Sequence, residues 1–391
     1  MLLLCVNIFS TPSTETLRMS ETIVACSSFV GVDLHKTTVT LVAVDAQGEQ
    51  IAKLTAATKC RDKITDWLRS LPQPVAMAVE ACPFIEWFID HFRWCVARIE
   101  IADATELARL RGKRRKTDYN DAWDIAERFA AGRCPLGFIA DDELMQLRKL
   151  GRHWRQLSHQ LSETKHGMRS LLHAANLDGP KVLDAASGHR WFLGEQHLLK
   201  PVQQQMFADF LDSLALVERQ RERLRRGITL ANRSETFRSI TDLLKTVPGI
   251  DEIWSCIIAA EIGPFDRFPN ADALEFWAGL TADLKESAGR RQSGNITKAG
   301  SRTLRWALCK AGVTLCFSDA KQETIRQRLI KRTGGIKPKA NVAMGRRLLR
   351  ILYAMVAKNT PYHNAQPVAR NLAANKARAA KRARKNGKEA A

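Results

Sequence analysis

Three extended runs rich in β-forming residues follow one another between Phe29 and Ala56, and they predict how the chain begins to fold. Two apolar runs come first, and the third follows a turn at Ala46-Gln47-Gly48. Strands joined by such short turns pair in antiparallel fashion, so this region predicts a meander of three strands.

Helices and short strands alternate from there to about Gly132. We expect a helix over 62–71, a buried strand in VAMAVEA that closes at Glu80, a helix over 84–93 and a strand over 96–101. Further helices follow. This alternation predicts an α/β domain.

Long segments rich in Leu, Ala, Arg, Gln and Glu occupy residues 141–239 and predict extended helices. Leu211, Leu214, Val217 and Leu224 fall near heptad spacing. That stripe either forms the seam of a coiled-coil dimer arm or packs on a neighbouring helix of the same chain, and the spacing alone leaves both open.

After Thr241 the pattern predicts a second compact and mostly helical domain, with a loop rich in Gly, Ser and Arg and two further helices ending near Ala357. The tail has seven Lys and Arg between positions 376 and 388 and almost no large apolar residue, so it should be disordered alone. We therefore divide the chain into a variable N-terminal extension (1–28), an α/β domain (29–140), a helical arm (141–240), a C-terminal domain (241–360) and a basic tail (361–391).

The charge balance points to the class of partner. Lysine and arginine number 61 against 41 aspartate and glutamate, which gives a formal net charge of +20. Basic residues gather at 109–116, 219–226 and 376–388. This excess predicts a polyanionic partner, although solvated helix faces without a ligand remain the alternative.

Several classes of protein are excluded by composition. Apolar residues make up 45% of the chain, which argues against wholesale disorder, and no apolar run is long enough to span a bilayer. The nine cysteines include no C-x-x-C pair, so we expect reduced thiols and no structural zinc. The apolar start MLLLCVNIF lacks a preceding cation, which argues against export, and Met19 is an alternative start.

Four carboxylates fall where a sheet could bring them together. Asp33 closes the first strand and Glu80 closes a later one, while Asp118 and Asp121 lie three apart at the start of a helix and can share a face. Such a cluster repels itself unless cations fill it, and Mg²⁺ prefers carboxylate oxygens. Taken singly, each acid except Glu80 could equally be a turn, cap or surface residue. Glu80 is the exception, because a carboxylate that ends the apolar run VAMAVE is costly to bury without a partner.

Three motifs carry a family resemblance. VGVDLHK, AVEA and RRKTDYNDA, in this order and spacing, resemble the DEDD motif of the RNase H-like, RuvC-type catalytic domain in insertion-sequence transposases of the IS110 family. The resemblance implies that Asp33, Glu80, Asp118 and Asp121 are catalytic and hold Mg²⁺. The segment ACPFIEW after Glu80 departs from the family, which often has a glycine-containing turn there.

The resemblance extends to the C-terminal domain and covers Phe29 to Ala357. In FWAGLTADLKESAGRRQSGNITKAGSRTLRWALCKA it implies that Ser287 is the catalytic serine. Residue types alone leave Ser293 and Ser301 as competitors, because a hydroxyl needs a base or metal to become a nucleophile wherever it lies.

Residues expected to contact nucleic acid surround both motifs. Val247-Pro248-Gly249-Ile250 joins two helices in the manner of a helix-hairpin-helix, whose backbone N–H groups can hold a phosphate, although a plain turn is equally compatible. The complete set of nucleic-acid contacts that we predict is Arg114, Arg115, Lys116, Gly249, Arg290, Arg291, Lys298, Arg302 and Arg305.

The resemblance implies a DNA transposase or recombinase that forms a phosphoserine link to DNA and is guided by a non-coding bridge RNA. We further expect a homo-oligomer, a dimer or tetramer, in the prokaryotic cytoplasm and associated with the nucleoid. Two alternatives remain: a metal-dependent nuclease of the Holliday-junction resolvase type without a covalent intermediate, and an RNA-binding structural protein without catalysis.

Overall fold

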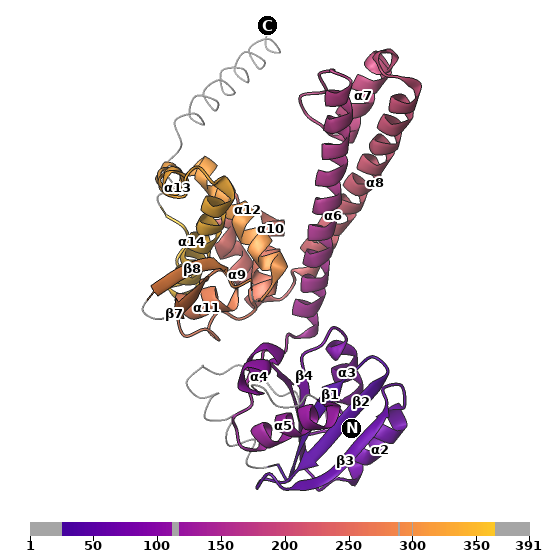
Figure 1. Cartoon of the computed structure of the whole chain (residues 1–391), viewed down its shortest axis with the longest axis vertical. Coiled ribbons are helices and arrows are strands. Elements are labelled where there is room, and N and C mark those ends of the chain that lie inside the picture. Colours follow the sequence, from indigo (N-terminus) through magenta and orange to yellow (C-terminus); the bar gives the residue numbers. More distant parts are fainter. Residues whose placement is uncertain (1–25, 112–116, 288–289, 299, 364–391) are drawn as a thin grey trace. The chain divides into compact units, whose positions relative to one another are not determined.

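The computed structural model describes residues 26–111, 117–287, 290–298 and 300–363. The chain divides into two compact units, residues 1–139 and 140–391. The first holds a mixed α/β sheet, and the second is helical apart from a small β-hairpin (Figure 1). The predicted order of an α/β sheet followed by a helical region is therefore confirmed. Most of the expected N-terminal extension and of the basic tail lies outside the described residues.

A six-stranded sheet forms the first unit, in the order β3-β2-β1-β4-β5-β6. Its strands are β1 (Ser28–Leu34), β2 (Thr38–Val44), β3 (Gln50–Ala57), β4 (Val75–Glu80), β5 (Arg98–Ala102) and β6 (Leu136–Gly137). The antiparallel pairing of β1, β2 and β3 confirms the predicted meander. β4 pairs with both β1 and β5 in parallel, so β1 and β4 end at the same edge of the sheet.

Helices cover both faces of this sheet. On one face, α2 (Arg61–Ser70) and α3 (Ile85–Phe92) pack on Val30, Val32 and Leu34 of β1. On the other face, α4 (Ala104–Arg111) and α5 (Asp118–Ala130) pack around Phe29. Since side chains alternate along a strand, the odd-numbered residues of β1 point toward α5.

A glycine in β1 permits very close packing by α5. A Cβ atom built on Gly31 would lie 2.0 Å from the backbone oxygen of Ala122 and 2.5 Å from the backbone nitrogen of Ala126. Both contacts are with helix backbone, which cannot rotate away as a side chain can. The absence of a side chain at Gly31 therefore determines how closely α5 approaches β1.

The second unit begins with a long helical hairpin. It consists of α6 (Asp142–Ala174), α7 (Ala185–Glu195), the short 3₁₀ helix η1 (Gln196–Leu198) and α8 (Pro201–Ala231) (Figure 1). Leu211 and Leu214 of the predicted stripe are buried in a core shared with Met168 and Leu172 of α6. The stripe thus packs within the chain, which is one of the two readings that the heptad spacing left open.

Two arginines join the base of this hairpin to the helices that follow. Arg148 donates to the backbone oxygen of Ala260 at 2.7 Å, and Arg152 pairs with the buried carboxylate of Glu261 at 3.0 Å. Carbonyls near the end of a helix and a buried carboxylate both favour a neighbouring cation. These contacts place the hairpin and the C-terminal helices in one compact unit.

Within the described residues, six further helices complete the second unit. They are α9 (Glu235–Lys245), α10 (Glu252–Ile262), α11 (Ala271–Trp277), α12 (Arg302–Ser318), α13 (Ala320–Arg332) and α14 (Lys337–Ala357). Helices α9 and α12 pack on the mostly buried helix α10, α14 packs on α12, and α11 and α13 pack on α14. Three helices rather than the expected two follow the serine-rich segment, because Asp319 ends α12 and caps α13 through its side chain. At the crossing of α12 and α14, Gly312 and Gly345 allow backbone-to-backbone contact.

The segment predicted as a Gly/Ser/Arg-rich loop is a β-hairpin, so that prediction was wrong. β7 (Ala282–Ser287) and β8 (Arg290–Ile296) pair in antiparallel fashion, with Ser287 opposite Arg290. Small and polar residues lowered the apparent strand propensity, but pairing of the two segments satisfies their backbone groups through cross-strand hydrogen bonds.

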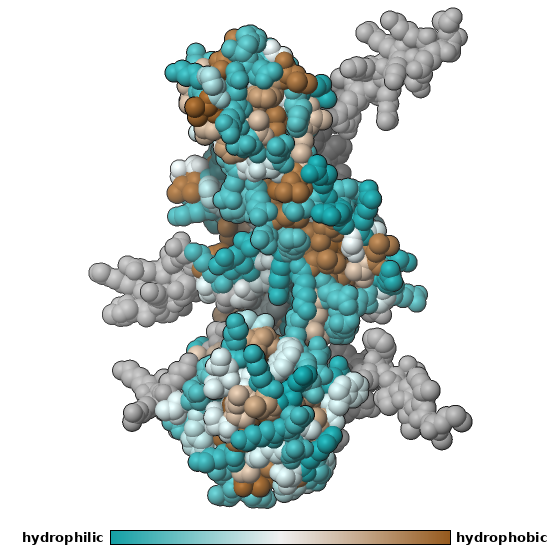
Figure 2. Space-filling view, turned by 90° about the vertical axis from the view of Figure 1, so that its right-hand side faces the viewer, coloured by the Kyte–Doolittle hydropathy of each residue, from teal (hydrophilic) through white to brown (hydrophobic). Residues whose placement is uncertain are grey.

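Among the described helices, none has both the length and the apolar content needed to cross a membrane. Hydrophilic residues cover most of the face seen in the space-filling view, with smaller hydrophobic patches between them (Figure 2). The eight cysteines within the described ranges are free thiols.

We predict that Gly31→Ala destabilises the first unit by about 1–3 kcal/mol or more, because the added methyl collides with the backbone of α5. Gly137→Ala is the matched control in the same sheet, since a Cβ there meets Ile101 at an ordinary 3.5 Å. Urea denaturation of both variants followed by circular dichroism measures the difference. Equal stabilities would contradict the close packing.

Candidate active site

The four predicted carboxylates lie where β1 and β4 end, on the side of the sheet covered by α5. Val32 pairs with Val79, so Asp33 and Glu80 are the next residues along two neighbouring parallel strands. Asp118 is the first residue of α5 and Asp121 lies one turn further on. The hydroxyl of Thr117 caps this helix by accepting from the Asn120 N–H at 3.1 Å.

Asp33 is the electrostatic centre of the group. It is only 7% exposed, and burial raises its pKa above the ordinary value. His35 lowers the pKa of Asp33, whereas the nearby carboxylates of Asp118, Glu80 and Asp121 raise it further. The structure therefore brings the other three predicted acids within electrostatic reach of Asp33.

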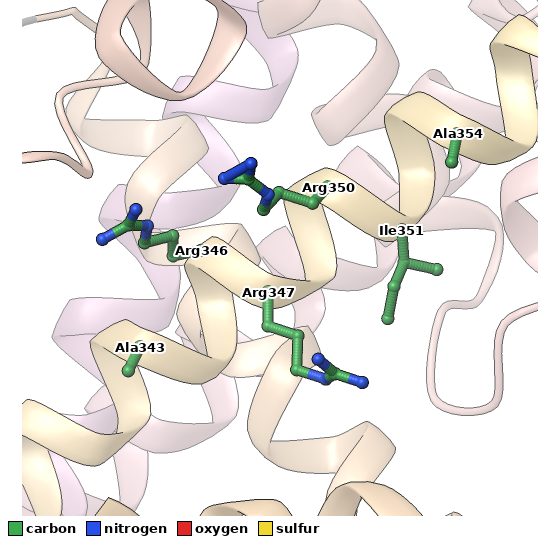
Figure 3. Close-up of a pocket in the computed structure, with 6 residues that line it drawn as sticks. All are labelled: Ala343, Arg346, Arg347, Arg350, Ile351 and Ala354. Carbon is green, nitrogen blue, oxygen red and sulfur yellow. The ribbon is translucent and has the colours of Figure 1, made fainter. Parts of the chain in front are cut away.

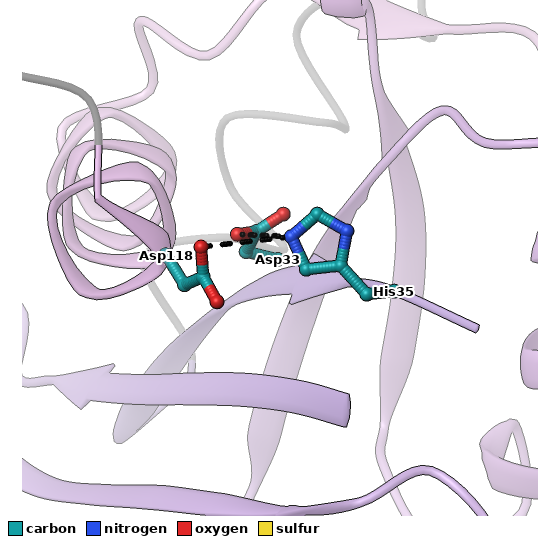
Figure 4. A group of neighbouring side chains, drawn as sticks. All are labelled: Asp33, His35 and Asp118. Atoms are coloured by element: carbon teal, nitrogen blue, oxygen red, sulfur yellow. Dashed lines mark ion pairs between the residues drawn. The ribbon is translucent and has the colours of Figure 1, made fainter. Parts of the chain in front are cut away.

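His35 belongs to the same group, and the sequence analysis missed it. Its Nε2 lies 3.3 Å from Oδ2 of Asp33 and 3.6 Å from Oδ1 of Asp118 (Figure 4). Strand periodicity could have found it, because a residue two positions after Asp33 continues on the same face of β1. The imidazole is about half exposed, as is the carboxylate of Asp118.

This set of donors fits a divalent cation. One atom each from Asp33, His35 and Asp118 lies within 4.8 Å of the others. Burial first, and repulsion by the neighbouring carboxylates second, raise the pKa of Asp33, and a bound cation would relieve that repulsion. Carboxylate oxygens from strand ends and a helix start thus form a candidate metal site.

The candidate serine lies in the C-terminal hairpin. Ser287 is the last residue of β7, and Ser293 stands opposite Leu284 in β8; the structure describes their backbone only. The competitor Ser301 has a structural role, because its hydroxyl caps α12 by accepting from the Leu304 N–H at 3.1 Å. That bond gives Ser301 a role independent of chemistry.

The predicted nucleic-acid contacts differ in their surroundings. Lys298 and Arg302 are exposed near the start of α12, and Lys298 has a left-handed backbone with φ of 57°. Arg305 instead donates to the backbone oxygens of Ala278 at 3.2 Å and Gly300 at 3.1 Å, and desolvation lowers its pKa. The backbone of Arg290 and Arg291 forms part of β8, while Arg114, Arg115 and Lys116 lie outside the described residues.

Gly249 lies in the turn between α9 and α10 and has a positive φ of 92°. A Cβ atom there would come within 2.5 Å of the side chain of Thr314, so packing on α12 accounts for the glycine. Asp251 caps α10 by accepting from the Trp254 N–H at 2.9 Å. Since this carboxylate already occupies the start of α10, the phosphate contact at Gly249 stays a prediction.

Helix α14 carries a cluster of three arginines that the sequence analysis did not predict. Arg346, Arg347 and Arg350 of α14 line a recess of about 400 Å³ (Figure 3). Arg346 and Arg350 both pair with the buried carboxylate of Glu275, and Arg350 also contacts Asp272 at 2.6 Å. Arg347, which points the other way in Figure 3, donates to Gln322 at 2.7 Å. These arginines stabilise the packing of α11 and α13 on α14.

Comparisons with known proteins match both halves of the chain. Residues 30–176 match the model of the DEDD transposase domain of IS110 elements, described as a transposase. Residues 241–327 match the model described as the transposase IS116/IS110/IS902 family. The first range contains the four carboxylates, and the second contains Ser287.

Curated relatives agree with these matches. A probable family 20 transposase of Pseudomonas aeruginosa is 25% identical over 345 residues, which cover 86% of this chain and 98% of that protein. An uncharacterized 43.6 kDa protein of the insertion element IS110 from Streptomyces coelicolor is 25% identical over 162 residues, 41% of this chain and 39% of that protein.

The two domain matches and the near full-length relative define an enzyme of the transposase class, which acts on DNA. The chain belongs to the IS110 family of transposases.

The raised pKa of Asp33 makes a prediction about stability. The pKa of Asp33 is higher in the folded protein than in the unfolded chain. The metal-free protein therefore loses stability as the pH rises from the ordinary carboxyl pKa through the raised pKa of Asp33. Asp33→Asn should therefore raise the melting temperature at neutral pH in EDTA, and the gain should vanish toward about pH 4. Asp66→Asn, an exposed carboxylate on α2, is the control and should show no such gain. If the melting temperatures of Asp33→Asn and wild type differed by the same amount at every pH, the raised pKa of Asp33 would be contradicted.

Proposed function

We propose that this transposase cuts and exchanges DNA strands through a phosphoserine link at Ser287, with Mg²⁺ held by Asp33, Glu80, Asp118 and Asp121. The proposal includes an RNase H-like, RuvC-type fold for the first unit. Carboxylates at the ends of β1 and β4, and the strand order β3-β2-β1-β4-β5, support that assignment.

The observation that carries the proposal is the convergence of four acids from three elements on one edge of the sheet. Burial of Asp33 with three neighbouring carboxylates makes the group unfavourable without a cation. When bound there, a divalent ion supplies Lewis-acid stabilisation of charge on phosphate oxygens. The protein's own contribution is to fix the carboxylates before DNA arrives, since their strands and helix are anchored in the core.

The role of Ser287 rests on its position in the family match and at the end of β7. In the proposed reaction its Oγ loses a proton and bonds to phosphorus, and one DNA strand leaves with a free hydroxyl. Ser301 is the weaker candidate because its hydroxyl caps α12.

Nucleic-acid binding is assigned to the cations flanking these groups, of which Lys298 and Arg302 are exposed. Arg114, Arg115, Lys116, Arg290 and Arg291 complete the proposed set, with Arg305 and Gly249 as supporting residues. A bridge RNA from the element that pairs with both DNA partners, and a dimeric or tetrameric assembly in the cytoplasm near the nucleoid, belong to the same proposal. The net charge of +20 is compatible with a large nucleic-acid surface.

The metal site predicts the effect of four conservative changes. Asp33→Asn, Glu80→Gln, Asp118→Asn and Asp121→Asn should each abolish recombination while the protein remains folded, because charge is lost with little change in volume. Glu127→Gln on the same helix α5 is the control and should remain active. An excision assay in cells measures recombination, and a circular-dichroism melt shows whether each variant remains folded. Full activity of any two of the four variants would contradict the metal site.

The serine predicts a covalent adduct. Ser287→Ala should eliminate a denaturant-resistant protein–DNA adduct, whereas Ser293→Ala and Ser301→Ala should retain it, although Ser301→Ala loses about 1 kcal/mol of helix capping. EDTA should also eliminate the adduct, since an unactivated hydroxyl is a weak nucleophile.

The measurement is a denaturing gel with labelled DNA, the cognate RNA and each variant. DNA cleavage by Ser287→Ala at the wild-type rate, with no adduct in any lane, would instead identify a water-using nuclease of the Holliday-junction resolvase type.

A further inference from the structure

We propose that His35 is a metal ligand of the carboxylate site, and that it makes the site bind a first-row transition ion such as Mn²⁺ more tightly than Mg²⁺. This inference rests on the proposed function, because it assumes that Asp33 and Asp118 hold a metal. It adds a ligand that the four-carboxylate motif does not contain, and it concerns which divalent ion the site binds more tightly.

The first support is the spacing of the donor atoms. Nε2 of His35 lies 3.3 Å from Oδ2 of Asp33 and 3.6 Å from Oδ1 of Asp118 (Figure 4). Two ligands at right angles, each about 2.1 Å from an octahedral ion, are about 3.0 Å apart. Both distances from His35 are therefore within about 0.6 Å of the spacing of neighbouring ligands around one ion, and all three donors lie within 4.8 Å of one another.

The second support is the way the backbone presents the imidazole. The N–H of His35 donates to the Thr38 backbone oxygen at 2.9 Å, and its own carbonyl accepts from the buried Thr58 hydroxyl at 2.8 Å. The N–H is thus fixed within the turn between β1 and β2, and the carbonyl is fixed by the residue that follows β3. A side chain on a fixed turn loses less conformational freedom when it binds an ion.

The third support is the chemistry of the ligand. Mg²⁺ prefers oxygen donors and gives up its waters reluctantly, whereas imidazole nitrogen is a good ligand for first-row transition ions. A site of several carboxylates and one histidine therefore favours the transition ion over Mg²⁺.

A different role would produce the same contacts. A protonated His35 could act as a counter-ion that neutralises Asp33 and Asp118 until a metal displaces it. The two roles predict opposite results when the imidazole is removed: loss of a ligand weakens transition-metal binding, while loss of a competing cation strengthens the binding of every divalent ion.

The experiment uses the purified full-length chain and Mn²⁺ as the probe. Bound Mn²⁺ is measured by electron paramagnetic resonance, Mg²⁺ by its competition, and nitrogen ligation by the ¹⁴N coupling in electron spin-echo modulation. Wild type should bind Mn²⁺ with a nitrogen coupling. His35→Gln should lose that coupling and about tenfold or more of its Mn²⁺ affinity, with a change in Mg²⁺ affinity of less than about threefold.

Two variants control the measurement. His153→Gln, an exposed histidine on α6, should retain the coupling, and Asp33→Asn should weaken the binding of both ions. Mn²⁺ bound by wild type without nitrogen coupling, or tighter binding of both ions by His35→Gln, would overturn the role of His35 and leave the carboxylate site standing. No Mn²⁺ or Mg²⁺ binding by wild type would overturn the proposed metal site as well.

Discussion

The contact of α5 with β1 at Gly31 is the constraint on which the candidate site depends. Two of the four carboxylates lie on strands of the sheet and two lie on α5, so their separation is set by how closely the helix packs. Any side chain at Gly31 would strike the backbone of Ala122 and Ala126. The apolar residues that follow on the inner face of α5, including Ile125 and Phe129, then hold the helix against the sheet.

This packing concentrates negative charge at a cost in stability. Asp33 is buried beside three other carboxylates, and its pKa is raised as a result. The half-exposed imidazole of His35 offsets part of the repulsion between Asp33 and its neighbouring carboxylates. Sites that are unfavourable in the free protein and favourable when a ligand binds are common where function requires the arrangement. In the first unit, the hydrophobic layers on both faces of the sheet stabilise the fold and offset the cost of this acidic site.

The second unit shows that the number of basic residues overstates the number of cations open to nucleic acid. Arg346 and Arg350 neutralise the buried Glu275, Arg152 pairs with the buried Glu261, and Arg305 donates to backbone carbonyls. A buried carboxylate needs such partners, because leaving it unpaired costs several kcal/mol. Several of the arginines are therefore engaged in contacts within the fold, and exposed residues such as Lys298 and Arg302 are better candidates for phosphate contacts.

The sequence by itself determined the α/β sheet, the helical second unit and the family, because strand and helix periodicities and the spacing of VGVDLHK, AVEA and RRKTDYNDA are local properties of the chain. It also identified the four acids, since their positions at strand and helix ends follow from those periodicities. Tertiary structure decided that the leucine stripe of α8 packs within the hairpin, that residues 282–296 pair as strands, and that His35 joins Asp33 and Asp118. The packing of α8 on α6 and the contact of His35 with Asp118 join segments far apart in the chain, and the local pattern of neither segment encodes such a contact. The strands at 282–296 are close in sequence, but their small and polar residues do not show the pairing that satisfies the backbone of both.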